Sequence, residues 1–72
     1  MEENKIKEME IIELSEILNM LESANDAYKR GSRSDCIERI INARKKLVLS
    51  DTITLEVKRE YTRKIDDLIY IL

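Results

Sequence analysis

Residues 11–31 read IIELSEILNMLESANDAYKRG, and this stretch decides the fold. Its apolar side chains recur at alternating steps of three and four, which gathers them on one face of an α-helix. Gly31, the only glycine of the chain, follows at once and favours the left-handed conformation that ends many helices. The stretch therefore predicts a long first helix over about residues 4–30. The members of its apolar seam are Ile11, Leu14, Leu18, Leu21, Asn25 and Tyr28, flanked by Ile17 and Ala24.

The remainder of the chain repeats the helical pattern twice. Ser32 or Ser34 can cap a second helix over about residues 34–49, and Asp51 or Thr52 can cap a third over 53–72. The short connections make neighbouring helices antiparallel, so we expect an all-α, up-down-up three-helix bundle. Its buried side chains are expected to be Cys36, Ile37, Ile40, Ile41, Ala43 and Leu47 in the second helix, and Leu55 or Val57, Tyr61, Ile65, Leu68 and Leu72 in the third.

Composition supports this reading. The 72 residues include no proline, histidine, tryptophan or phenylalanine, and 39% of them are charged. This length favours one domain, residues 1–72, which buries only about 60% of its unfolded surface and has a marginal core. The longest apolar run, residues 68–72, is far shorter than a membrane span, and the acidic start does not resemble a signal peptide. We therefore expect a cytoplasmic protein without a membrane span.

The sequence offers little for catalysis. Without histidine, a general base would have to come from another residue type, and three packed helices of this size leave no obvious pocket beside one. Asp66 and Asp67 are adjacent, so their side chains diverge by about 100° on a helix. Cys36, the single cysteine, could be a nucleophile at a helix start, but it is better explained as a small core residue. No enzyme activity, metal or cofactor is expected.

Charge is unevenly distributed along the chain. Residues 1–22 are mainly acidic and residues 23–50 mainly basic. Either an acidic helix packs beside a basic one, or the basic segment attracts an anionic partner. Direct nucleic-acid binding is not expected, because the basic stretch lacks the aromatic residues and glycines of known nucleic-acid modules. The alternative is a small regulator or inhibitor, for example phage-encoded, whose acidic first helix imitates phosphates with Glu2, Glu3, Glu8, Glu10, Glu13 and Glu16.

The predicted helices differ in length, which leaves part of the first one without a neighbour. At about 1.5 Å per residue, the first helix is about 40 Å long and the second only about 24 Å. Roughly ten residues at the start should overhang the bundle. This segment either frays or packs on a second copy of the chain, which would give a homodimer. Its apolar residues, the candidate self-association surface, are Ile6, Met9, Ile11 and Ile12.

Around the first turn the sequence is similar to two families of helical proteins. Alanines and other small residues stand at Ala24, Ala27, Cys36 and Ala43, around Gly31. This register resembles tetratricopeptide helical hairpins and the microtubule-interacting-and-transport (MIT) domain. Glu60-Tyr61, Lys64, Ile65, Leu68 and Leu72 look like the last MIT helix.

The MIT resemblance implies a non-enzymatic protein-binding module, whose family binds short helical or extended tails of membrane-remodelling filament proteins. It implies a peptide groove between the second and third helices. That groove would be lined by Ile41, Arg44, Val48, Tyr61, Lys64 and Asp67. A fainter likeness to the Hha/YmoA nucleoid-associated proteins runs through residues 37–41 and 49–51 and through Ile65 and Leu68.

Overall fold

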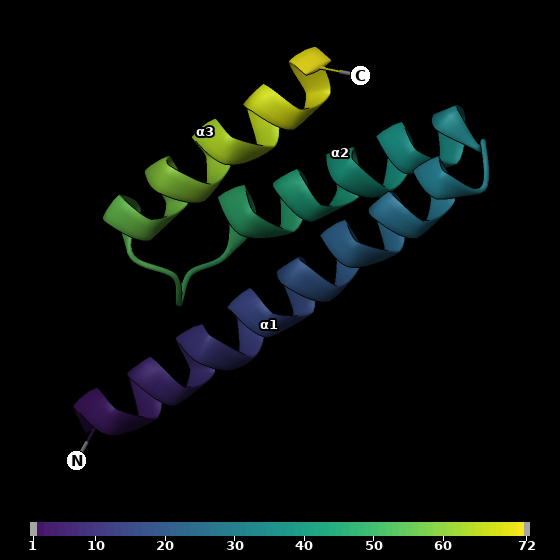
Figure 1. Cartoon of the computed structure of the whole chain (residues 1–72). Coiled ribbons are helices and arrows are strands. Elements are labelled where there is room, and N and C mark those ends of the chain that lie inside the picture. The colour runs from purple at the N-terminus through teal and green to yellow at the C-terminus, as the bar shows by residue number, and fades with distance from the viewer. Residues whose placement is uncertain (1, 72) are drawn as a thin grey trace.

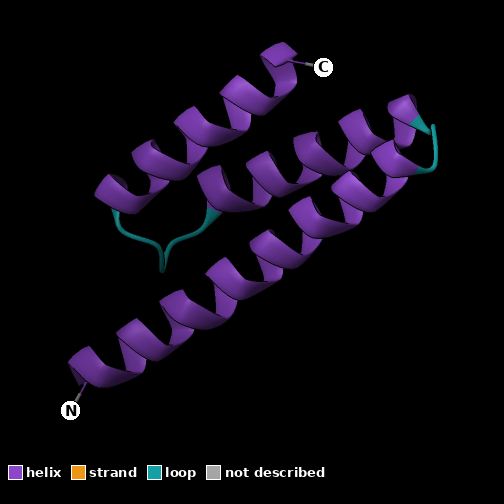
Figure 2. Cartoon of the chain, in the orientation of Figure 1, coloured by secondary structure: helices purple, strands orange, loops and turns teal. Residues whose placement is uncertain are grey.

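Residues 2–71 fold into three α-helices joined by two short connections (Figure 1). The computed structural model describes the backbone of residues 2–71 and the side chains of residues 8–71. The helices are α1 (Glu2–Lys29), α2 (Arg33–Leu49) and α3 (Leu55–Ile71), and residues 2–71 contain no strand (Figure 2). The all-α, up-down-up arrangement with a long first helix, predicted from the sequence, is confirmed.

Helix α2 occupies the middle of the molecule. It packs closely along α1 on one side and against α3 on the other. Within the described backbone, no Cα atom of α1 lies within 8 Å of one in α3. The molecule is accordingly long and narrow, with principal extents of 46 × 18 × 14 Å. Much of α1 and α3 is therefore left without a helical neighbour.

The turn between α1 and α2 is built on Gly31, as the sequence predicts. Gly31 adopts φ +82°, in the left-handed region. Its N–H donates to the carbonyl of Tyr28 at 3.0 Å, and the N–H of Ser32 donates to the carbonyl of Ala27 at 2.9 Å. This pair of bonds satisfies two carbonyls at the end of α1, in the pattern of a Schellman motif. Ser32 occupies the cap position of α2. Its hydroxyl accepts no backbone N–H of the helix and instead donates to Asp35 Oδ2 at 2.8 Å.

The buried face of α1 is rotated relative to the predicted seam. The fully buried residues of α1 are Ile17, Ala24 and Ala27, whereas Leu18 and Tyr28 of the seam are exposed. The predicted seam is therefore only partly the core face: Leu14 and Leu21 pack against the core, and the flanking Ile17 and Ala24 are more deeply buried than the seam itself. Small side chains allow two helices to approach closely, so the alanines take the centre of the α1–α2 contact and the leucines are displaced to its edge.

The start of α3 also differs from the prediction. Thr54 precedes the helix and accepts a hydrogen bond from the Val57 N–H at 3.4 Å, so the expected caps at Asp51 or Thr52 were wrong. The cause lies in the connection, where the Ser50 hydroxyl accepts the N–H groups of Thr52 and Ile53, each at 3.2 Å. This turn buries Ile53 and delays the helix to residue 55.

The core draws on all three helices and on the second connection. Of the expected core residues, Ile37 is only partly buried, Ile41 and Leu68 are exposed, and Leu72 lies outside the described residues. Between the alternatives for α3, Val57 packs against the core and Leu55 is 65% exposed. The buried apolar residues are Ile17, Ala24, Ala27, Cys36, Ile40, Ala43, Leu47, Ile53 and Ile65.

Candidate functional site

A shallow, open groove lies along one face of α3, beside the end of α2. Its volume is about 560 Å³, and its α3 wall is formed by side chains three or four residues apart, which share one face of the helix. Val48 on α2 and Leu55 on α3 supply exposed apolar surface. The residues that line it are Val48, Leu55, Lys58, Arg59, Thr62, Arg63, Asp66 and Asp67.

Charged side chains dominate the wall of this α2–α3 groove. Arg44 Nε of α2 lies 2.9 Å from Asp66 Oδ1 of α3, an exposed ion pair that contributes only about 0.2–1 kcal/mol. The Lys58 ammonium donates to the carbonyls of Val48 and Ser50, so it satisfies acceptors at the end of α2. Arg59 and Arg63 form no ion pair among the described residues. These two guanidinium groups are available to an external partner.

The structure gathers only part of the predicted partner-binding set in this groove. Val48 and Asp67 line the groove. Arg44 does not line it but forms an ion pair with Asp66, which does. Tyr61 instead packs against the core, with the Lys64 ammonium 5.1 Å from the centre of its ring. Ile41 is exposed on α2 and is not among the residues that line the groove.

Sequence reasoning missed several residues of the groove wall. Leu55, Arg59 and Arg63 follow each other at steps of four, a spacing that places them on one helical face. This signal was present in the sequence. The sequence also allows Leu55 on the core face, and in that rotation of the helix Arg59 and Arg63 would not face the groove.

A second, apolar cleft lies between α1 and α3, with α2 as its floor. Its volume is about 210 Å³, and apart from Asn25 and the hydroxyl of Tyr28 its lining is apolar. Cys36, a free thiol, is buried there. The cleft exists because the backbones of α1 and α3 do not approach each other. Its lining residues are Leu21, Ala24, Asn25, Tyr28, Cys36, Ile40, Leu68 and Ile71.

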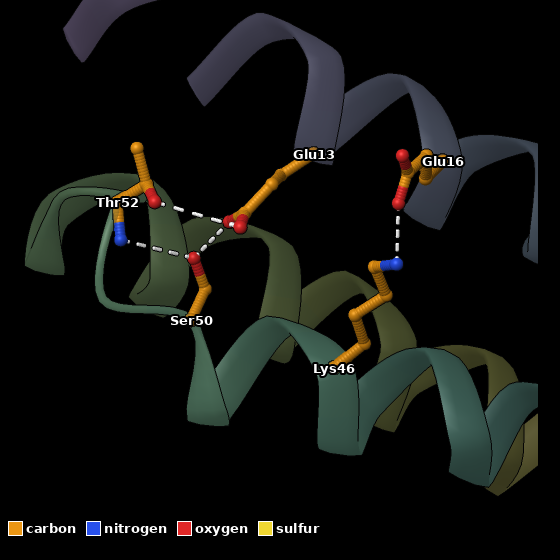
Figure 3. Close-up of polar contacts among 5 residues, drawn as sticks. All are labelled: Glu13, Glu16, Lys46, Ser50 and Thr52. Carbon is orange, nitrogen blue, oxygen red and sulfur yellow. Dashed lines mark hydrogen bonds and ion pairs between the residues drawn. The ribbon is translucent and has the colours of Figure 1, made fainter. Parts of the chain in front are cut away.

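Polar contacts fix α1 against α2 and the second connection (Figure 3). Glu13 accepts hydrogen bonds from the hydroxyls of Ser50 and Thr52, and Glu16 pairs with Lys46. The Glu16–Lys46 pair agrees with the interpretation that an acidic helix packs beside a basic one. Glu13 also marks where α1 meets the connection between α2 and α3, so the helix extends beyond it as an overhang (Figure 1).

The candidate self-association residues belong to this overhang. Met9, Ile11 and Ile12 are all more than half exposed, and the side chain of Ile6 lies outside the described residues. Exposed apolar side chains gathered on one segment mark an interaction surface more often than scattered single ones do.

Two further properties concern the described part of the chain. It contains no group of three or more histidine, cysteine, aspartate or glutamate side chains placed to hold a metal ion. None of its helices combines the length and apolar character needed to cross a bilayer.

The fold and the groove define the class: a small all-α protein with exposed grooves between its helices. Comparison with known protein families, with characterised proteins and with solved structures finds no match. The resemblances to the MIT domain, to tetratricopeptide hairpins and to the Hha/YmoA proteins therefore stay predictions.

Proposed function

We propose that this protein is a non-enzymatic helical interaction module that binds a peptide or partner helix in the α2–α3 groove. The observation that carries the proposal is the groove itself, in which exposed Val48 and Leu55 are flanked by Arg59 and Arg63. An amphipathic helix can place its apolar side chains on such a surface and its charged ones against the walls. The exposed apolar surface would then be covered in the complex.

Charges along α3 define the polarity of the expected partner. Arg59 and Arg63, which form no ion pair among the described residues, lie in the first half of α3, and Asp67 follows in the second half. A partner helix that is acidic in its first turns and basic in its last would complement both ends when parallel to α3. This charge order is also the one that favours an isolated helix, because it matches the helix dipole.

The test is a selection of displayed amphipathic helical peptides on the purified chain. We expect enrichment of peptides with acids in their first turns, and we expect Val48→Asp to weaken their binding at least about tenfold, because a carboxylate would be buried without a partner. Binding is measured by fluorescence anisotropy with the enriched peptides.

Leu49→Asp is the matched control. Leu49 is the neighbour of Val48 on α2, is 76% exposed and does not line the groove, so its substitution should leave binding unchanged. Equal binding of the enriched peptides to wild type and to Val48→Asp, or a failure of the selection to enrich any helical peptide, would contradict the proposal.

We also propose that the chain forms a homodimer through the N-terminal half of α1. Met9, Ile11 and Ile12 are exposed and precede Glu13, the residue where α1 meets the connection, and this supports the assignment. The alternative of a phosphate-mimicking regulator is not favoured by a specific observation, since Glu13 and Glu16 make contacts inside the molecule. The cytoplasmic location stays a prediction from the sequence.

A further inference from the structure

Part of the apolar seam of α1 remains exposed after the chain has folded, although Leu14 and Leu21 pack against the core. Leu18 is 45% exposed and Tyr28 is 53% exposed, although both follow the alternating three-and-four spacing typical of helices that pack along a second helix. Across the α1–α3 cleft, Leu68 is 45% exposed and Ile71 is 80% exposed. The two edges of the cleft therefore form one apolar face, and along α1 this face continues to Ile11 in the overhang.

The total surface of the chain indicates how much of it could be covered. The accessible area is 5627 Å². A compact monomer of 8.5 kDa is expected to expose about 4,650 Å², so this chain exposes about 1,000 Å² more. One partner in a stable protein–protein interface buries about 800 Å². The excess is spread over the whole elongated molecule, overhang included, and it is at least as large as the area that one partner buries in a stable interface.

The polar residues on this face suit a second copy of the same chain. Glu22 and Lys29, which directly follow Leu21 and Tyr28, are exposed and carry opposite charges beside the seam. A symmetric interface brings each surface patch against its own copy, so a face of mixed charge can complement itself. Asn25 occupies a seam position, where a polar side chain sets the register between paired helices at some cost in stability.

We propose that a second copy of this chain docks on the α1–α3 cleft, so that the exposed seam of each α1 packs into the cleft of its partner. This inference extends the proposed self-association from the overhang to the whole length of α1 and to the edge of α3. It also gives the apolar cleft an occupant, because the large seam side chains of one copy fill the space between α1 and α3 of the other.

The experiment is light scattering on the full chain across a concentration series, with one variant on the exposed seam of α1 and one on the α3 edge of the cleft. Wild type is expected to give the mass of a dimer at the higher concentrations, and Leu18→Glu and Leu68→Glu the mass of a monomer throughout. Circular dichroism confirms that each variant retains its helices. Two variants are used because the inference needs both the seam that enters the partner's cleft and the α3 edge that receives it, and either variant remains informative if the other fails to fold.

Two controls locate the interface. Leu49→Glu places the same charge at a more exposed leucine of α2 and should leave the dimer intact. Ile12→Glu changes a residue that lies on the overhang but off the seam. If this variant loses the dimer while Leu18→Glu and Leu68→Glu remain dimeric, the interface is the overhang and the assignment to the cleft is overturned. A wild-type chain that stays monomeric at every concentration would overturn it as well. Peptide binding to the monomeric Leu18→Glu variant tests the α2–α3 groove without the dimer. A failure of dimerisation can therefore be told apart from a failure of peptide binding.

Discussion

Gly31 joins α1 to α2 in a backbone conformation that strains any residue with a Cβ atom. Its φ is +82°, and a Cβ built there would meet no atom within 4 Å. The cost of Gly31→Ala should therefore be conformational rather than steric, and we expect a loss of about 1–2 kcal/mol in the free energy of unfolding. Urea denaturation followed by circular dichroism measures this change.

Asparagine is the matched comparison at the same position. Because asparagine tolerates the left-handed conformation better than alanine, Gly31→Asn should retain more stability than Gly31→Ala. Equal stability of wild type and Gly31→Ala would show that the turn does not depend on the left-handed backbone.

At the scale of elements, the contact between α1 and α2 depends on small side chains. Ala43 of α2 is fully buried, as are Ala24 and Ala27 of α1. Ala43→Leu would force additional atoms between the two helices, and overpacking of this kind costs about 1–3 kcal/mol. Asn42→Leu adds an apolar side chain at the adjacent exposed position and should be close to neutral. Chemical denaturation measures the free energy of unfolding of the two variants. A similar value for both would contradict a close approach of α1 and α2 at Ala43.

The sequence predicts the helices well and their rotation poorly, and the reason is physical. The three-and-four spacing and Gly31 report local geometry, so the existence of α1 and its end follow from them. Which face of α1 is buried depends on the size of side chains on α2, such as Ala43, which local spacing does not encode. The start of α3 depends on the hydrogen bonds of the Ser50 hydroxyl, which also involve Glu13 from a distant part of the chain.

In the candidate site, too, the sequence predicts which residues lie on a helix better than it predicts which way that helix faces. Val48 and Asp67 were predicted to share a groove, and they do line one. Tyr61 and Lys64 were assigned to it by a resemblance that concerns the order of residues and carries no information on how α3 is rotated about its axis. Arg59 and Arg63 could have been found from their spacing of four, once Leu55 was removed from the core.

For the whole molecule, the position of α2 between the other helices suggests that stability is unevenly distributed. Helix α1 packs along α2 over a long contact, whereas α3 contributes Ile65 as its only fully buried side chain among the described residues. Regions with few buried apolar contacts open at lower free energy than the remainder of a protein. We therefore expect α3 to open separately from the α1–α2 hairpin, with faster amide hydrogen exchange.

Ile65→Val tests this uneven distribution. Removal of one buried methyl group costs about 0.5–1.5 kcal/mol, so amides of α3 should exchange about two- to tenfold faster, while amides in the middle of α1 change much less. Leu55→Val removes one methylene group at a position of α3 that is 65% exposed and lies outside the α1–α3 cleft, so it should alter neither set. Hydrogen exchange measured by NMR separates the helices residue by residue. An equal acceleration in α1 and α3 would mean that the three helices open as one unit, because the loss at Ile65 would then be shared by every amide that exchanges only through global unfolding.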